Sequence, residues 1–296
     1  GVSANGNLAW LGVRGIPIQV QPAEVVKLTF ILLLARQLVW MKGRGDMKSI
    51  PAVGLLAGNL LVTIGLYYVI SSDMGSALVY VCIFACMAFA AGVALRWFAL
   101  GIFGAGAGFY LLWELDKIPP YMKERFQVLV DHSLYPLGAG WQQTRSLLTL
   151  GGGRIFGQGL FRGTQTQSEA ASSLPHRHTD FIFSVIGEEL GLVGCLLTLA
   201  LLTAIILRCL YVARHAKTRL EGYACIGVAS VIIFQVIINV GMCLFVMPVI
   251  GLTLPFFSYG GSSLVTMFFA MGIVSGINMR PAPDSSARYI RPPLSA

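Results

Sequence analysis

Seven stretches of the sequence contain close to 20 mainly apolar residues each, and a helix of about that length crosses the roughly 30 Å of hydrocarbon in a bilayer. Only 11% of the 296 residues are charged and 56% are hydrophobic. A soluble domain carries about 25% charged residues and cannot bury so apolar a chain at this length. The short alternating segments of a β-barrel do not occur. The sequence therefore predicts an all-α polytopic membrane protein with seven transmembrane helices, at Ala23–Trp40, Pro51–Ile70, Gly75–Ala94, Trp97–Trp113, Phe181–Leu207, Tyr223–Val246 and Leu264–Asn278.

Lysine and arginine are unevenly distributed between the two sets of connecting loops. Every second connection is basic, through Lys42, Arg44, Lys48, Arg96, Arg208, Arg214, Lys217, Arg219, Arg280, Arg288 and Arg291. Because basic loops stay in the cytoplasm, we expect the C-terminal tail (about 280–296) inside and Gly1 outside. This placement accounts for the net charge of +8, so we expect no nucleic-acid partner.

The six cysteines lie in or beside the apolar runs, so we expect neither a disulfide framework nor a cysteine metal site. The chain starts without Met on a polar segment, Gly1–Gln21, that we expect outside the membrane. We therefore expect a preceding segment to have carried it across. We treat residues 1–296 as a single membrane domain.

The external loop between the fourth and fifth spans, about 114–180, is long for a structureless connection and is expected to be functional. It is basic and contains Gly151–Gly153, Gly157, Gly159 and Gly163. With Arg154 and Arg162, these glycines could bring backbone amides and guanidinium groups to a phosphate. A flexible turn region over a membrane cavity explains the glycines equally well.

Ionisable residues at membrane depth are costly and so are candidates for function. Glu24 and Lys27 lie three apart, hence on one helix face, either as a packing pair or as a polar wall of a substrate cavity. Asp180 opens the fifth span, either as a carboxylate favoured by the helix dipole or as a general base. Glu188 lies about 80° round the helix from Asp180 and Glu189 about 180°, so only Glu188 is expected to share its cavity.

Two further stretches of the outer face are less specific. His176 and His178 form a weak metal-ligand set, so the identity of any metal ligand stays unknown, and surface-loop histidines are the commoner explanation. The segment from Pro248 to Ser263 is apolar with two prolines, and it reads as a re-entrant or capping segment buried against protein.

Five motifs, in order along nearly the whole chain, resemble the SEDS family of RodA, FtsW and SpoVE. They are Gln21–Leu28 (QPAEVVKL), Ser72–Ala77 (SDMGSA), Gly157–Leu160 (GQGL), His178–Gly191 (HTDFIF followed by GEELG) and Pro255–Ser263 (PFFSYGGSS). The segment Gly163–Gln167 (GTQTQ) is more similar to RodA than to FtsW.

The resemblance implies a ten-helix fold, of which this chain would contain the last seven helices. It implies a peptidoglycan glycosyltransferase of the bacterial plasma membrane that takes lipid II as donor and acceptor outside the membrane and works with a class B penicillin-binding protein. Asp180 matches the essential aspartate of the family, and Trp10, Glu24 and Lys27 match its substrate-binding tryptophan and polar pair. The chain departs from the family pattern at Ala9, where arginine is usual, and at His176, where glutamate is usual.

The chemistry expected from this resemblance uses Asp180 to remove the proton of the acceptor hydroxyl, with inversion at the anomeric carbon. Arg154, Arg162 or Arg177 would neutralise the departing pyrophosphate, with a divalent cation (Mg²⁺ or Mn²⁺) as a further candidate. Two alternatives remain open. One is a transporter (flippase) for the lipid-linked precursor, and the other is a non-catalytic scaffold of the cell-wall machinery.

Overall fold

A computed structural model describes residues 2–4, 7–12, 19–44, 49–71, 73–132, 134, 138–168 and 174–280. Its helices are α1 (Pro22–Gly43), α2 (Ile50–Ser71), α3 (Met74–Ala91), α4 (Leu95–Glu114), α5 (Pro120–Val130), α6 (Ala139–Gly152), α7 (Ile182–His215), α8 (Arg219–Cys243) and α9 (Gly261–Met279). Each of the seven apolar runs corresponds to one helix, which confirms the polytopic helical fold. Five helices (α2, α4, α7, α8 and α9) are long and apolar enough to cross a membrane, and Gly75–Ala91 within α3 is a shorter apolar helix.

A small sheet near the start of the chain was not predicted from the sequence. Its strands β1 (Val2–Ala4), β2 (Asn7–Gly12) and β3 (Gln19–Val20) are antiparallel, with β2 in the middle. Strands of two to six residues give too short an alternating pattern to be recognised from sequence. The strand β2 contacts α1 and α2, so the sheet is seated at the end of the bundle where α1 begins.

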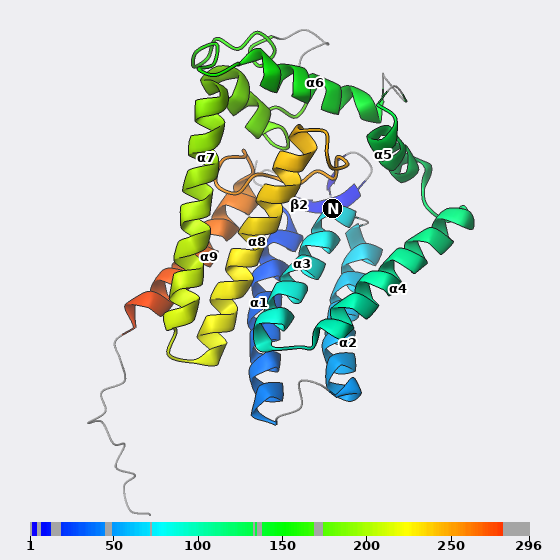
Figure 1. Cartoon of the computed structure of the whole chain (residues 1–296), viewed down its shortest axis with the longest axis vertical. Coiled ribbons are helices and arrows are strands. Elements are labelled where there is room, and N and C mark those ends of the chain that lie inside the picture. Colours follow the sequence, from blue (N-terminus) through cyan, green and yellow to red (C-terminus); the bar gives the residue numbers. More distant parts are fainter. Residues whose placement is uncertain are drawn as a thin grey trace, which may run out of the picture.

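Helix α8 forms the centre of the bundle and contacts α1, α3, α6, α7 and α9 (Figure 1). It is buried around much of its circumference, as expected for a helix that is apolar on all sides. Gly227 allows close packing there, because a Cβ at this position would lie 2.5 Å from the Ile31 side chain. Helix α4 has no buried residue and leans away from the other helices (Figure 1).

Local sequence signals set several helix ends. Asp73 caps α3 by accepting hydrogen bonds from the backbone N–H groups of Gly75 and Ser76, and Gly92 ends the helix with φ 95°. Thr218 and Glu221 form a reciprocal capping box at the start of α8. These signals turn the chain sharply between adjacent spans.

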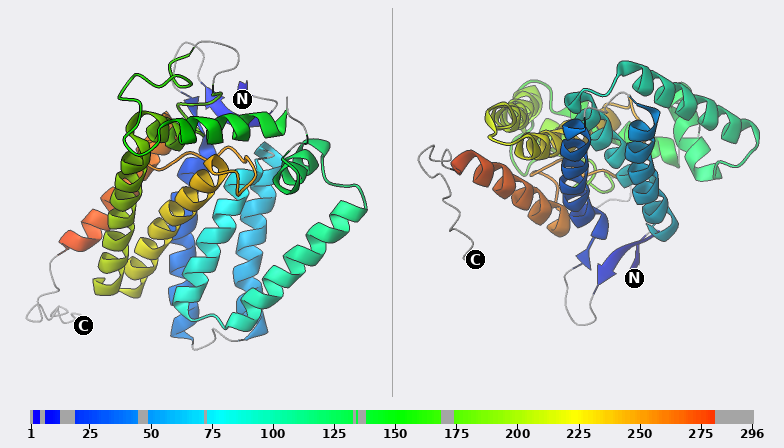
Figure 2. Two further views of the ribbon diagram at one scale, coloured as in Figure 1. Left: turned by 45° about the horizontal axis from the view of Figure 1, so that its top comes forward. Right: turned by 90° about the horizontal axis from the view of Figure 1, so that it is seen from below.

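The loop between α4 and α7 contains two helices that were not predicted from the sequence. They are α5 and α6, which lie across one end of the bundle (Figure 2). Both helices mix polar and apolar residues, so neither contains the long apolar run by which the other helices were predicted. Gln143 connects α6 to the end of α8, because its Nε2 donates hydrogen bonds to the carbonyl oxygens of Met242 (3.3 Å) and Met247 (2.7 Å).

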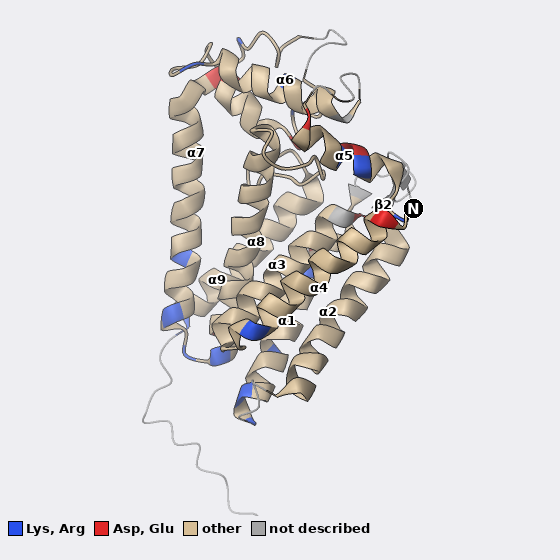
Figure 3. Ribbon diagram, turned by 45° about the vertical axis from the view of Figure 1, so that its right-hand side comes forward, with Lys and Arg blue, Asp and Glu red and all other residues tan. Residues whose placement is uncertain are grey.

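The two ends of the bundle differ in charge. Lys and Arg occupy the ends of α1, α7 and α8 that lie opposite α5 and α6 (Figure 3). This is the asymmetry that the loop charges predict, and it places Asp180 at the end covered by α5 and α6.

Candidate functional site: the Asp180 turn

Asp180 lies in a tight turn immediately before α7. His176 has a left-handed backbone (φ 50°), and its carbonyl oxygen accepts hydrogen bonds from the N–H groups of Thr179 (3.1 Å) and Phe181 (3.3 Å). The Asp180 side chain is partly buried. The turn therefore presents one carboxylate in a fixed position at the end of the bundle.

The segment between α8 and α9 holds this turn in place. Ser258 Oγ donates a hydrogen bond to the carbonyl oxygen of Thr179 (2.6 Å) and accepts one from the N–H of Leu254 (2.7 Å). The N–H of Tyr259 donates to the carbonyl oxygen of His178 (2.8 Å). The prediction of a segment packed against protein is confirmed for this stretch, whose role is to brace the Asp180 turn.

Asn239 of α8 connects the Asp180 turn to the segment between α8 and α9. Its Nδ2 donates hydrogen bonds to the carbonyl oxygens of Asp180 (2.8 Å) and Leu252 (2.7 Å). The side chain is completely buried. Both N–H bonds of one amide group thus fix the Asp180 backbone against the 249–260 segment.

Three elements distant in sequence meet around the Asp180 carboxylate. The Cβ position of Gly251 lies 3.7 Å from Asp180 Oδ2. Arg125 of α5 reaches the same segment, since its Nη1 donates to the carbonyl oxygen of Val249 (2.5 Å). The start of α3 is also adjacent, because a Cβ on Gly75 would lie 2.6 Å from the carbonyl oxygen of Ile250.

These surroundings shift the acidity of Asp180. Burial raises the pKa of Asp180 above its usual value, since a desolvated carboxylate is costly. His176, the Thr179 hydroxyl and the positive charge of Arg125 lower this pKa in part, and the negative charge of Asp73 raises it further. A carboxylate with a raised pKa is a stronger base than a solvated one, as general-base catalysis requires.

Asp73 is the second carboxylate of this region. Its oxygens accept hydrogen bonds from Ser76 Oγ (2.7 Å), Tyr67 Oη (3.1 Å) and the N–H of Gly75 (3.0 Å). Because these donors occupy it, Asp73 is fixed as the cap of α3. Among the residues that the structure describes, no hydrogen bond from another helix or strand holds the Asp180 carboxylate. Its oxygens are therefore more available to a substrate than those of Asp73.

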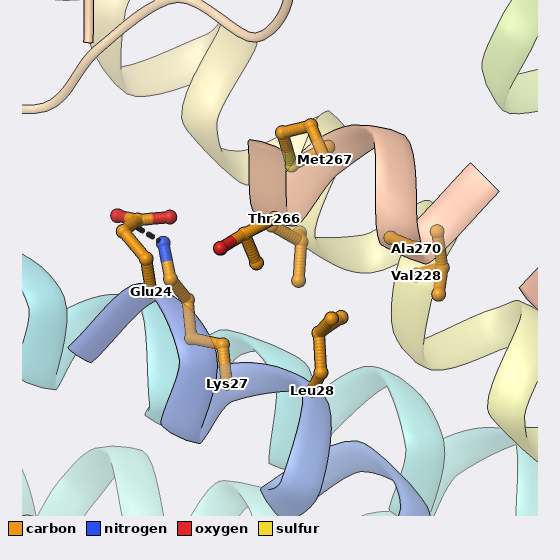
Figure 4. A pocket seen from close by; sticks show the side chains of 8 residues that line it. Glu24, Lys27, Leu28, Val228, Thr266, Met267 and Ala270 are labelled. Carbon is orange, nitrogen blue, oxygen red and sulfur yellow. Dashed lines mark hydrogen bonds and ion pairs between the residues drawn. The ribbon is translucent and has the colours of Figure 1, made fainter. Parts of the chain in front are cut away.

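Glu24 and Lys27 form an ion pair (2.7 Å) at the start of α1, and both side chains are buried. The pair faces a small cavity between α1, α8 and α9, where Thr266 points toward it (Figure 4). Glu24 Oε2 has no hydrogen-bond partner among the described residues. The pair therefore keeps one acceptor available to the cavity, and both roles considered for it, packing and substrate contact, remain predictions.

Glu188 and Glu189 are buried anchors for the loop that precedes them in sequence. The carboxylate of Glu188 accepts hydrogen bonds from Thr164 Oγ1 (3.1 Å) and from the N–H groups of Gln165 (2.8 Å) and Thr166 (2.9 Å). Glu189 accepts from the N–H of Phe161 (3.0 Å) and from the side chains of Thr166 and Gln167. These bonds give Glu188 a loop-anchoring role in the described structure, and the substrate contact predicted for it stays a prediction.

The glycines of the external loop allow backbone segments to pack closely. A Cβ on Gly157 would overlap the backbone of Glu189, and one on Gly191 would overlap that of Ile155. The N–H groups of Gln158 (2.9 Å) and Gly159 (3.0 Å) donate to the carbonyl oxygens of Glu188 and Glu189. These amides are consequently used within the chain, which argues against both a phosphate cradle and a flexible turn at these positions.

The arginines predicted to contact substrate occupy different surroundings. Arg154 and Arg162 are exposed beside this loop. Arg177 lies next to the Asp180 turn, where its Nη1 donates to the carbonyl oxygen of Ser168 (2.9 Å). Trp10 lies in β2, and its side chain is outside the described part of the chain. Which of these residues binds substrate stays a prediction.

Sequence reasoning missed Arg125 and Asn239. Arg125 is one of many charged residues between 114 and 180, and nothing in its spacing distinguishes it. Asn239 carried a usable signal, because a buried amide within an apolar helix needs hydrogen-bond partners.

Among the described residues, no group of three or more His, Cys, Asp or Glu side chains could hold a metal ion. The described residues therefore do not form a metal site made by protein ligands alone.

Fold and site together define a multi-pass helical membrane protein with a braced, partly buried aspartate at one end of its bundle. The chain belongs to the cell cycle protein family of FtsW, RodA and SpoVE, which matches it over residues 1–282. This family match confirms the resemblance of the five motifs.

The chain spans 72–73% of the length of three curated relatives, two of which carry the name peptidoglycan glycosyltransferase. The chain is 35% identical to the probable peptidoglycan glycosyltransferase FtsW of Tolumonas auensis, over 97% of this chain and 72% of the relative. It is 33% identical to the peptidoglycan glycosyltransferase MrdB of Escherichia coli K12 (94% and 72%) and 34% identical to the stage V sporulation protein E of Bacillus subtilis (94% and 73%).

Solved structures show the same fold. A chain of a peptidoglycan synthase complex, described for its coordination of polymerization and crosslinking, matches with a TM-score of 0.76 and 33% identity, over 93% of this chain and 74% of that one. A mutant of the RodA protein of Thermus thermophilus matches with a TM-score of 0.63 and 31% identity, over 93% and 70%.

Proposed function

We propose that this protein is a peptidoglycan glycosyltransferase that lengthens glycan strands from lipid II, in cell elongation or division. The observation that carries the proposal is the Asp180 turn, in which hydrogen bonds from Ser258, Tyr259 and Asn239 to backbone carbonyl oxygens brace the segment that carries one partly buried carboxylate. The names of its relatives supply the reaction class. The basic opposite end of the bundle supports a cytoplasmic C-terminus and an external Asp180.

In the proposed reaction Asp180 accepts the proton of the acceptor sugar hydroxyl as its oxygen attacks the anomeric carbon of the donor. The bond from that carbon to the phosphate oxygen breaks, and the polyprenyl pyrophosphate leaves with the electron pair. A single displacement inverts the anomeric carbon. The raised pKa of Asp180 favours the proton transfer, provided that the pH keeps Asp180 ionised.

Arg125 is a further candidate for stabilising the leaving pyrophosphate, beside Arg154, Arg162 and Arg177. Among the described arginines it is the one whose charge acts on Asp180. A guanidinium group at that place would offset the negative charge that develops on the phosphate oxygen. A requirement for Mg²⁺ or Mn²⁺ also belongs to the proposal and is tested by adding EDTA to the assay.

A class B penicillin-binding protein is the proposed partner, which is supported by the similarity to a chain of a synthase complex. The decisive experiment is polymerisation of labelled lipid II by the protein with this transpeptidase, comparing wild type, Asp180→Asn and Asp116→Asn. Asp116 is a matched control because it is an exposed aspartate in the connection before α5.

We expect glycan ladders from wild type and Asp116→Asn, and a loss of about 10²–10⁴-fold in rate for Asp180→Asn, the usual contribution of a general base. Asp180→Asn should not lower the unfolding temperature, since burial disfavours the charge that it removes. Ladders of normal length from Asp180→Asn would eliminate the base assignment. If folded wild type forms no ladders, transport or scaffolding is favoured. A liposome assay of lipid movement would then distinguish a transporter, which moves the lipid, from a scaffold, which does not.

A further inference from the structure

Four large apolar side chains are exposed together on the loop between α6 and α7. Ile155 is 57% exposed, Phe156 81%, Leu160 58% and Phe161 75%. We call these four residues the apolar rim. They lie in the green loop beside the start of α7 (Figure 1). A cluster of this kind on a protein surface marks contact with another apolar phase.

The apolar rim is fixed to α7. The N–H groups of Leu192 (2.9 Å) and Val193 (3.2 Å) donate to the carbonyl oxygens of Arg154 and Ile155. Two further bonds join Gln158 and Gly159 to Glu188 and Glu189. The rim therefore cannot fold back to bury its side chains without breaking this backbone pairing.

The length of α7 gives the depth of the rim in the membrane. From Leu192 to Arg214 the helix rises about 33 Å, at about 1.5 Å per residue. This equals the roughly 30 Å of hydrocarbon in a bilayer, with Arg214 at the basic end. The backbone that pairs with Leu192 and Val193 consequently lies at the opposite edge of the hydrocarbon.

The surface of α7 continues the rim into the lipid. Leu192, Val193, Leu196 and Leu197 are each 51–59% exposed and follow one another down a single helix face. A helix this apolar can expose such a face only to lipid. The rim is the upper edge of this lipid-facing surface.

Arg154 and Arg162 flank the rim, and both are exposed. Neither forms an ion pair with a described residue. Arginines at this level can reach lipid phosphates while their aliphatic stems remain in apolar surroundings.

We propose that residues 154–162 form an interfacial anchor, which inserts the apolar rim into the leaflet on the Asp180 side while Arg154 and Arg162 bind lipid phosphates. Helix α7 is kinked at Gly191, where the backbone is non-helical (φ 68°). The anchor holds this kink, and with it the Asp180 turn, at a constant height above the hydrocarbon. The membrane is favoured over a protein partner because the rim is continuous with the lipid-facing surface of α7.

The test places an environment-sensitive label at Phe156→Cys, in nanodiscs of phosphatidylethanolamine and phosphatidylglycerol. Its emission is quenched either by lipids with a nitroxide just below the headgroup or by a water-soluble paramagnetic ion. Thr164→Cys is the matched control, because Thr164 is an exposed polar position of the same loop. Since this change removes the hydroxyl that donates to Glu188, thermal unfolding of the variant must first match that of wild type. The protein without an added cysteine is treated in the same way, and its signal gives the background from labelling of the native cysteines.

We expect the lipid nitroxide to quench the label at 156 several-fold more than the label at 164, and the aqueous ion to show the reverse order. Arg154→Glu with Arg162→Glu should reduce the lipid quenching at 156, because the added charges oppose anionic phosphates. Equal aqueous quenching at 156 and 164 would overturn the anchor. A label at 156 that becomes shielded only after the transpeptidase is added would also overturn it and identify a protein interface. The measurement requires no enzymatic activity, so its failure is distinct from failure of the proposed function.

Discussion

The side-chain amide of Asn239 donates a hydrogen bond to the carbonyl oxygen of Asp180 across 59 positions of sequence, at 2.8 Å. Its second N–H binds the carbonyl oxygen of Leu252. The position of the proposed base thus depends on a residue that itself has no contact with the reacting atoms. We regard Asn239 as a positioning residue.

Asn239→Leu should lower kcat for lipid II polymerisation while KM changes little, because the carboxylate loses its fixed position but the binding surface remains. Two buried hydrogen bonds are lost, each worth about 0.5–1.5 kcal/mol. Asn59→Leu is the matched control, because it removes an amide hydrogen bond between α2 and α1 (Asn59 Nδ2 to Gln37 Oε1, 2.8 Å). An equal fall in kcat in both variants would reduce the role of Asn239 to general stability.

Arg125→Gln should move the acidic limb of the pH–rate profile to higher pH. The positive charge of Arg125 lowers the pKa of Asp180, so its removal lets burial raise that pKa further. Protonated Asp180 cannot accept a proton, and activity is therefore lost at a higher pH than in wild type. Arg125→Lys, which keeps the charge, should retain the wild-type limb, and an unchanged limb in both variants would contradict the electrostatic link.

Glu24→Gln should destabilise the protein by about 3–5 kcal/mol, the usual effect of leaving one charge of a buried ion pair unpaired. Combining it with Lys27→Met removes both charges and should restore much of the stability. A double-mutant cycle tests this, with thermal unfolding in detergent measured for wild type, both single variants and the double variant. Strictly additive losses would show that the two side chains do not stabilise each other.

Gly157→Ala should lower stability by about 1–3 kcal/mol, the usual range for overpacking. The new Cβ would overlap the backbone of Glu189, and the backbone there has φ 79°. Gly58→Ala in α2 is the control, since its Cβ would meet nothing within 4 Å and alanine favours a helix. A Gly157→Ala protein as stable as wild type would disprove the close packing of the loop against α7.

The sequence by itself determined the membrane character, the seven apolar helices and the charge difference between the two ends. Apolar runs and basic loops are local properties, and partition between lipid and water acts on them directly. The order of short motifs around Asp180 and Glu24 was also sufficient to identify the family.

Only the tertiary structure decided which groups surround Asp180. Arg125 arrives from α5, Asp73 from the start of α3 and Asn239 from α8, because these helix ends converge on one side of the bundle. It also decided that Glu188 is saturated by the N–H groups of a neighbouring loop, which its angle to Asp180 on a helical wheel did not indicate. Hydrogen bonds and charge interactions act over a few ångströms in space, and distances along the chain do not encode them.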